Sequence, residues 1–107
     1  MIQKTKMREL DPNIRKRNFE EVAIGYTEEE AIQEAKRCIQ CKNPRCVSGC
    51  PVNVYLPEFI SEVAKGNFEA AHLILLKQNS LPAICGRVCP QETQCEGNCV
   101  VGIRNDP

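Results

Sequence analysis

The spacing of its eight cysteines constrains this chain more than any other feature of the sequence. The first cysteine block, residues 38–50, has the pattern C-x2-C-x4-C-x3-C and is followed by Pro51. The second cysteine block, residues 85–99, has the pattern C-x3-C-x5-C-x3-C and contains Pro90. No cysteine lies outside these two blocks. This segregation indicates a domain that binds something through sulfur.

The rest of the composition is short of large apolar residues, so a bound ligand would help to stabilise the fold. At 107 residues the chain is one small domain, and its aromatic residues are three Phe and two Tyr, with no Trp. The large apolar side chains that dominate most cores are therefore scarce. Small domains that lack core usually add disulfides or metal.

Charge and hydropathy exclude several classes of partner. Lys plus Arg equals Asp plus Glu, 14 each, so there is no basic excess for nucleic acid or a membrane surface. No apolar run approaches the roughly 18 residues of a membrane span, and the N-terminus has no secretory apolar segment. We expect no nucleic-acid partner, no membrane partner and a cytoplasmic location, where thiols stay reduced.

Local patterns predict three helices. Thr27 and Glu30 have the spacing of a capping box, so a helix should begin at residue 28. Its apolar face, which includes Ile39, should carry Cys38 and Cys41 into the interior, and Asn43-Pro44 should end it. A second helix has Pro57 in its first turn and an apolar stripe from Leu56 to Ala64. A third, about residues 68–78, should follow Gly66-Asn67 and complete a helical hairpin.

The other segments are expected to be irregular or polar. Residues 1–18 should form a polar, basic N-terminal arm, with Phe19, Val22 and Ile24 as the first core anchors. Residues 46–54 should be a tight loop, and the second cysteine block should be irregular. The apolar stretch 68–76 should be core. The predicted fold is an all-α, small helical domain over residues 19–107, with two cysteine-rich cluster-binding loops.

Three kinds of sulfur chemistry fit eight cysteines: iron–sulfur clusters, structural zinc and disulfides. Zinc sites usually use paired C-x2-C knuckles, and only Cys38 and Cys41 form one. Three close cysteines followed by x3-Cys-Pro is a ferredoxin pattern, in which the fourth cysteine binds the other cluster. Here x4 replaces one x2 interval, so the block is a variant of that pattern. The spacing favours two [4Fe–4S] clusters, and zinc and disulfides stay open as alternatives.

In two-cluster ferredoxins one cysteine of a block binds the other cluster, and this rule predicts which cluster each cysteine of the first block binds. Cys38, Cys41 and Cys46 should bind one cluster, and Cys50 should bind the second. A remote cysteine must then complete the first cluster. Backbone N–H groups near Gly49, Gly86 and Gly97 are candidate hydrogen-bond donors to the sulfurs.

Several motifs together resemble one specific module, and the likeness covers essentially residues 8–107. They are Asn18-Phe19-Glu20-Glu21-Val22, Gly25-Tyr26-Thr27, Glu34-Ala35-x-Arg37-Cys38-x-x-Cys41, Cys46-x3-Cys50-Pro51 and Cys85-Gly86-Arg87-Val88-Cys89-Pro90. The module is the N-terminal iron–sulfur domain of the NADPH-dependent glutamate synthase small subunit. Related modules occur in dihydropyrimidine dehydrogenase and in the large subunit of NADH-dependent reduced ferredoxin:NADP oxidoreductase.

The resemblance implies an α-helical ferredoxin domain with two [4Fe–4S] clusters and assigns their ligands by position. The first cluster would be held by Cys38, Cys41, Cys46 and Cys99, and the second by Cys50, Cys89 and Cys95. In the family the fourth ligand of the second cluster is usually a Glu or Gln beyond the last cysteine, which here would fall after Pro107. Cys85 matches a family cysteine that is not usually a ligand. Cys85, Asp106 or solvent could substitute for the missing group.

The resemblance also implies a function within a longer flavoprotein. An FAD- and NADPH-binding region would follow residue 107, and the clusters would relay single electrons between the flavin and a second redox centre, expected on a second redox subunit. The chain would be the iron–sulfur part of a glutamate-synthase-type NADPH oxidoreductase, without a catalytic site of its own. The alternative is a zinc-stabilised protein-interaction domain without redox chemistry.

The remaining polar candidates have weaker signals. His72, the only histidine, lies in the third helix and is expected at the surface. Five cations near the cysteine blocks could tune cluster potentials, guide docking to an acidic partner or form ordinary surface: Lys36, Arg37, Lys42, Arg45 and Arg87.

Overall fold

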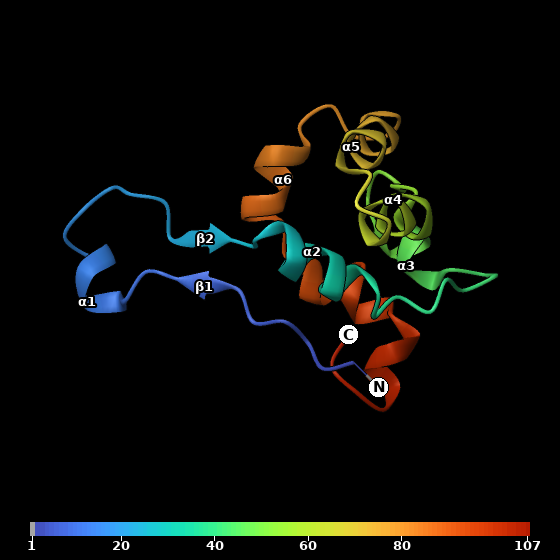
Figure 1. Cartoon of the computed structure of the whole chain (residues 1–107), viewed down its shortest axis with the longest axis horizontal. Coiled ribbons are helices and arrows are strands. Elements are labelled where there is room, and N and C mark those ends of the chain that lie inside the picture. Colours follow the sequence, from blue (N-terminus) through green and yellow to red (C-terminus); the bar gives the residue numbers. More distant parts are fainter. Residues whose placement is uncertain (1) are drawn as a thin grey trace.

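The computed structural model describes residues 2–107, and helices dominate that part of the chain (Figure 1). Its two strands are β1 (Arg8–Glu9) and β2 (Ala23–Gly25), which pair antiparallel. The α-helices are α1 (Pro12–Arg15), α2 (Glu28–Ala35), α3 (Arg45–Gly49), α4 (Leu56–Ala64), α5 (Phe68–Leu76) and α6 (Pro82–Val88). Three 3-10 helices follow: η1 (Gln91–Thr93), η2 (Glu96–Asn98) and η3 (Val100–Ile103). The predicted all-α fold is confirmed, with one short β-ribbon projecting from the helical body.

Helix α2 begins as predicted. The Glu30 backbone N–H donates to Thr27 Oγ1 at 3.2 Å, and the Thr27 backbone N–H donates to Glu30 Oε2 at 2.9 Å. This reciprocal pair satisfies two N–H groups that the first helical turn leaves free. The capping box therefore fixes where the chain enters the helix.

The predicted end of this helix is wrong. Helix α2 ends at Ala35 and not at Asn43-Pro44, so Cys38 and Cys41 lie in the segment after it. The Cys38 backbone N–H donates to the Ala35 carbonyl at 3.2 Å, which tightens the last turn. Gln40 then takes a left-handed φ of 51°, a conformation that a right-handed helix cannot include. Ile39, expected on the interior face, is 57% exposed as a result.

Helices α4 and α5 form the predicted hairpin. Gly66 takes a φ of 82°, its N–H donates to the Val63 carbonyl, and the Asn67 N–H donates to the Glu62 carbonyl, each at 2.9 Å. This bond pattern is a Schellman motif, which reverses the chain directly after α4. Helix α5 ends at Leu76, two residues before the predicted position. The two helices pack against each other, and α2 packs against α4.

Two helices occupy segments that were predicted to be irregular. Helix α3 overlaps the first half of the expected tight loop, and α6 includes Cys85 and Gly86 of the second cysteine block. Helix α3 has only five residues, too few for an apolar periodicity to appear. Helix α6 begins at Pro82, a residue suited to a first helical turn.

The apolar core is small. Among residues 2–107, the buried hydrophobic residues are Val54, Ala71 and Val101, together with buried Pro57. The predicted core anchors were wrong, because Phe19 is fully exposed and Val22 and Ile24 are 41% and 57% exposed. In the stretch 68–76, Ala71 is buried as predicted, whereas the exposed side chains are Leu73 and Leu76.

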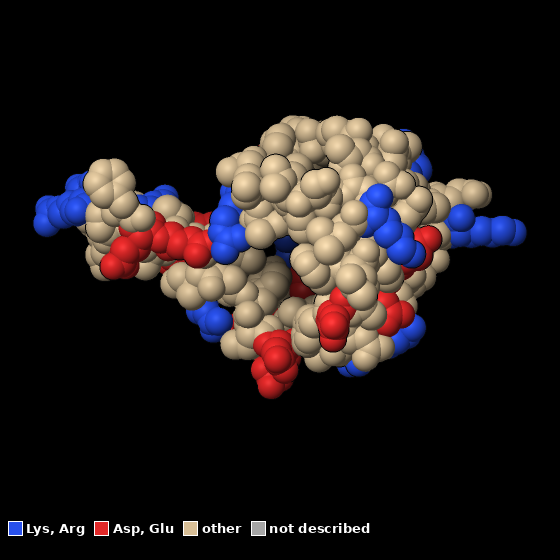
Figure 2. Space-filling model, turned by 90° about the horizontal axis from the view of Figure 1, so that it is seen from above, with Lys and Arg blue, Asp and Glu red and all other residues tan. Residues whose placement is uncertain are grey.

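Much of the remaining apolar surface lies on α5 and α6. These helices are uppermost in Figure 1 and face the viewer in Figure 2, where a broad area carries no charged side chain. Leu76, Leu81, Ile84 and Val88 are all exposed in this region. None of the helices in the described residues is long and apolar enough to cross a membrane.

The N-terminal segment contacts the helical body through polar groups. The Thr5 backbone N–H donates to Glu34 Oε2 at 2.6 Å, and the Tyr26 hydroxyl donates to the Thr5 carbonyl at 2.8 Å. The segment therefore runs beside α2, the helix that precedes Cys38 (Figure 1).

The left-handed turn after α4 provides a stability test. Gly66→Ala should lower the free energy of unfolding by about 1–2 kcal/mol, since a Cβ disfavours positive φ. Steric overlap adds little, because the nearest atom to such a Cβ is Ile32 Cδ1 at 3.7 Å. Urea unfolding monitored by circular dichroism measures the change.

Gly86→Ala is the matched control, because Gly86 lies inside α6 with no atom within 4 Å of the added Cβ. It should be neutral or stabilising by about 0.5–1 kcal/mol. Equal effects of the two substitutions would contradict the assigned role of Gly66.

Candidate metal centre

The eight cysteines lie at or near the ends of short elements. Cys38 and Cys41 lie between α2 and α3, Cys46 is in α3 and Cys50 directly follows it. Cys85 is inside α6, and Cys89 directly follows this helix. Cys95 and Cys99 flank η2. All eight are half-buried and free, so the structure forms no disulfide among them.

Helix α3 and η2 bring the two cysteine blocks together. A Cβ added at Gly49 would lie 2.5 Å from Asn98 Nδ2 and 2.8 Å from the Gln94 carbonyl oxygen. Only a residue without a side chain permits this approach. Asn98 Nδ2 also donates to the Gln94 carbonyl at 2.7 Å, which fixes the loop that carries Cys95 and Cys99.

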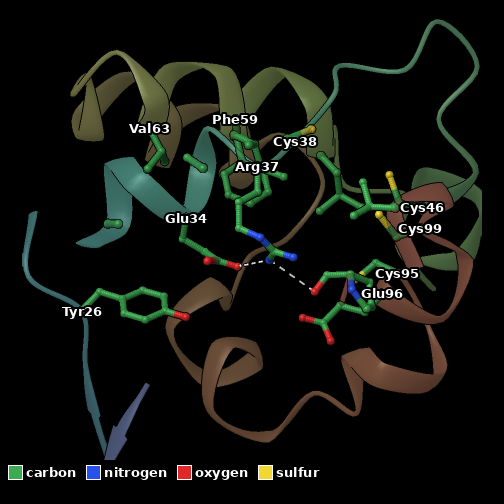
Figure 3. A pocket seen from close by; sticks show the side chains of 16 residues that line it. Tyr26, Glu34, Arg37, Cys38, Cys46, Phe59, Val63, Cys95, Glu96 and Cys99 are labelled. Atoms are coloured by element: carbon green, nitrogen blue, oxygen red, sulfur yellow. Dashed lines mark hydrogen bonds and ion pairs between the residues drawn. The ribbon is translucent and has the colours of Figure 1, made fainter. Parts of the chain in front are cut away.

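A cavity of about 380 Å³ lies beside the joined blocks (Figure 3). Cysteines from both blocks line it: Cys38, Cys46, Cys95 and Cys99. In Figure 3, Cys46 and Cys99 lie next to each other on one side of the cavity. Helices α2 and α4 supply apolar walls, including Ala35, Leu56, Phe59, Ile60 and Val63. Thiols and apolar side chains thus share one sheltered space.

Four sulfurs form a first neighbourhood. Burial raises the pKa of the Cys38 thiol, and the nearby Cys41 and Cys99 sulfurs raise this pKa further. Burial likewise raises the pKa of Cys46, with added contributions from Cys99 and Cys38. The neighbourhood joins three cysteines of the first block to the last cysteine of the second.

Three sulfurs form a second neighbourhood. Burial raises the pKa of the Cys95 thiol, and Glu96, Cys89 and Cys50 add to this increase. Cys50, from the first block, is therefore associated with two cysteines of the second block. Cys85 is not among the main influences on the Cys95 pKa, and its Sγ lies 3.8 Å from Asn79 Oδ1.

These neighbourhoods have the same members as the two predicted ligand sets. The ligand assignment stays a prediction, because neighbouring thiols do not by themselves identify what they bind. Within residues 2–107 no group of three or more His, Cys, Asp or Glu is close enough to hold a single metal ion.

The donor set fits an iron–sulfur cluster chemically. Thiolates are the usual protein ligands of [4Fe–4S] clusters, and two sulfur neighbourhoods lie beside apolar walls. The raised pKa values of Cys38, Cys46 and Cys95 mean that binding must release protons from these thiols. Backbone N–H groups of Gln40, Val47 and Glu96 lie near the sulfurs of Cys38, Cys46 and Cys95 and lower the pKa of these thiols, against the larger effect of burial. These donors lie beside the predicted positions in two of three cases, near Gly49 and Gly97.

Two glutamine contacts to sulfur were missed in the sequence analysis. Gln40 Nε2 donates to Cys38 Sγ at 3.4 Å, and the Cys89 thiol donates to Gln94 Oε1 at 3.2 Å. A glutamine beside a cysteine carries no distinguishing pattern in one sequence. The contacts depend on backbone conformation, which only the structure provides.

Two of the five cations considered as tuning residues, Arg37 and Arg87, are paired. The buried Arg37 Nη1 is 2.5 Å from Glu34 Oε1, and Arg87 Nε contacts Glu21 on the surface. Each acidic partner offsets the charge of its arginine, so an effect on cluster potential stays a prediction. His72 is exposed on α5, as predicted.

Arg37 also joins both ends of the described chain to α2. Its guanidinium donates to the carbonyls of Asp106 and Pro107 and, at 3.4 Å, to the carbonyl of Ile2. Arg37 and Pro107 both line the cavity, so these contacts join the chain ends to its wall.

Comparison with known proteins identifies similar sequences over most of the chain. Residues 15–107 match the family described as dihydropyrimidine dehydrogenase domain II, 4Fe-4S cluster. The glutamate synthase [NADPH] small chain of Escherichia coli (strain K12) is 44% identical over 89 residues, covering 82% of this chain and 19% of the relative. The corresponding protein of Bacillus subtilis (strain 168) is 35% identical over 115 residues, covering 99% and 23%.

A third relative has a different name. The putative oxidoreductase AegA of Escherichia coli (strain K12) is 39% identical over 88 residues, covering 81% of this chain and 13% of that protein. The chain spans about a fifth of the length of the glutamate synthase small chains it matches.

The contact at Gly49 yields a test of how the blocks are joined. Gly49→Ala should reduce the iron bound per chain after anaerobic reconstitution, because the new methyl group must push η2 away from α3. Gly86→Ala, where the added methyl meets nothing within 4 Å, should bind as much iron as the wild type. Colorimetric iron analysis per chain makes the comparison. Undiminished iron in Gly49→Ala would show that the blocks need not approach so closely.

Proposed function

The chain belongs to the dihydropyrimidine dehydrogenase domain II family of 4Fe-4S domains, and on that premise we propose that it is an electron-relay domain holding two [4Fe–4S] clusters. When bound, such clusters supply reversible one-electron transfer. The proposed ligands are Cys38, Cys41, Cys46 and Cys99 for the first cluster, and Cys50, Cys89 and Cys95 for the second.

The observation that supports this assignment is that each cysteine block contributes one sulfur to the neighbourhood formed mainly by the other block. Cys99 shares a neighbourhood with the cysteines of the first block, whereas Cys50 shares one with those of the second. Exchange of one cysteine between two ligand sets is the arrangement of two-cluster ferredoxins. It holds two sites near each other, as an electron relay needs.

The protein surroundings support the same role. Apolar side chains of α2 and α4 line the cavity beside Cys38 and Cys46, which limits the access of water. Backbone donors such as Val47 and Glu96 direct N–H groups at sulfur. Burial and hydrogen bonds to sulfur are two of the means by which a protein sets a cluster potential.

The second site requires a fourth ligand. Cys85, in α6, contacts Asn79, which precedes that helix, and Asp106 is exposed with its carbonyl bonded to Arg37. Neither residue is among the main influences on the Cys95 pKa. We therefore propose that this ligand comes from the chain that follows residue 107 in the longer relatives.

The relatives suggest the setting of the relay. Proteins named glutamate synthase [NADPH] small chain contain a similar segment as about a fifth of their length. The proposal places an FAD- and NADPH-binding region in the same parent chain and a further redox centre on a second subunit. A cytoplasmic location is consistent with eight reduced thiols. The parent would be the oxidoreductase, and this domain its iron–sulfur part.

Iron and acid-labile sulfide per chain test the cluster proposal. Protein purified and reconstituted without oxygen should hold about eight irons and eight sulfides, the content of two [4Fe–4S] clusters. About four of each, rising when some twenty following residues of a relative are appended, would support two sites with one incomplete. Zinc without sulfide after reconstitution would reject the relay in favour of a zinc-stabilised interaction domain.

Single cysteine variants test the ligand sets. Cys41→Ala and Cys95→Ala should each lose about four irons per chain, because each removes a ligand of a different cluster. Cys85→Ala is the matched control and should retain the wild-type iron content. If Cys85→Ala loses as much iron as Cys95→Ala, then Cys85 is a ligand and the assignment of the second site is incorrect.

A further inference from the structure

Gln40 has an unusual backbone conformation at a chemically important place. It lies between Cys38 and Cys41, and its φ is 51°. The left-handed region is uncommon for residues other than glycine, and Asn and Asp enter it more readily than Gln does. Observed backbone strain of this kind tends to be retained where function requires it.

The left-handed conformation brings two donors of Gln40 to one sulfur. Its side-chain Nε2 donates to Cys38 Sγ at 3.4 Å, and its backbone N–H lies near the same sulfur and lowers the pKa of that thiol. Sulfur hydrogen bonds are longer than those to oxygen, so the side-chain distance is within their range. One residue thus supplies two N–H groups to one proposed cluster ligand.

The direction of the hydrogen bond distinguishes Gln40 from Gln94. At Gln94 the thiol of Cys89 is the donor and the amide oxygen accepts, so this bond is lost when the thiol loses its proton. At Gln40 the amide is the donor. Its bond persists with a thiolate and becomes stronger, because hydrogen bonds to charged groups exceed those to neutral ones.

We propose that Gln40 is a positioning residue whose side-chain amide donates to the coordinating sulfur of Cys38 and raises the reduction potential of the cluster held there. This inference rests on the proposed function. Reduction adds one electron to the bound cluster and increases the negative charge on its sulfur ligands. An N–H donor stabilises this reduced form more than the oxidised form, which makes the potential less negative.

Redox titration of the reconstituted full chain, followed by electron paramagnetic resonance, tests the inference. Gln40→Met keeps the length of the side chain and removes its donor. Gln40→Gly also removes the donor, retains the backbone N–H and accommodates the positive φ without strain. Gln33→Met, on the exposed side of α2, is the matched control without a sulfur contact.

Iron and sulfide are measured first, so that failure of the proposed function is seen before any potential is read. If the wild-type chain holds no cluster, the electron-relay function fails and the inference fails with it. With the cluster present and its iron content unchanged in the variants, Gln40→Met and Gln40→Gly should both shift one potential to more negative values. Gln33→Met should leave every potential at its wild-type value.

Two outcomes would overturn the role of Gln40 while leaving the relay intact. The first is a loaded cluster whose potential is the same in wild type, Gln40→Met and Gln40→Gly. The second is a shift in Gln40→Met that is absent in Gln40→Gly, because the shift would then come from altered backbone geometry and not from the lost amide donor.

Discussion

The shortage of buried apolar side chains is the constraint on which this structure depends. Val54, Ala71 and Val101 are its buried hydrophobic residues within the described chain, and none of them is large. Burial of a few small side chains contributes only a few kcal/mol, which the entropy lost on folding exceeds. The cavity beside Val101 is lined in part by four thiols. In such a domain the binding of an iron–sulfur cluster and the formation of the fold are coupled.

The elements around the thiols can be understood from this constraint. The hairpin of α4 and α5 supplies a rigid wall, because two backbone hydrogen bonds, accepted by the carbonyls of Glu62 and Val63, fix its turn. Helix α2 packs on that wall and leads into the loop of Cys38 and Cys41. The absence of a side chain at Gly49 then lets the second cysteine block approach the first. Short rigid pieces hold the cysteine loops where a larger core would otherwise be needed.

Features encoded by a few neighbouring residues were predictable from the sequence. Thr27 and Glu30 gave the start of α2, and the apolar stripe with Gly66 gave the hairpin. The spacing of the cysteines indicated the donor type and the likeness to a known module. These signals are local, so tertiary contacts do not change them.

Other features depend on contacts that one sequence does not contain. Helix α2 ends at Ala35, and the backbone turns left-handed at Gln40 five residues later; no residue preference of glutamine predicts such a turn. Helices α3 and α6 are too short for a clear apolar period. Phe19 has the character of a core residue but no partner in the helical body, so it remains exposed. Which sulfurs are neighbours follows from the packing of α3 on η2, a long-range contact.

The contacts of Arg37 have a mechanical consequence. One guanidinium holds the carbonyls of Ile2, Asp106 and Pro107, so both ends of the described chain meet at the same side chain. A force that pulls these ends apart therefore acts first on the hydrogen bonds of Arg37, whose guanidinium is held in place by Glu34. The cysteine loops contribute no group to these hydrogen bonds.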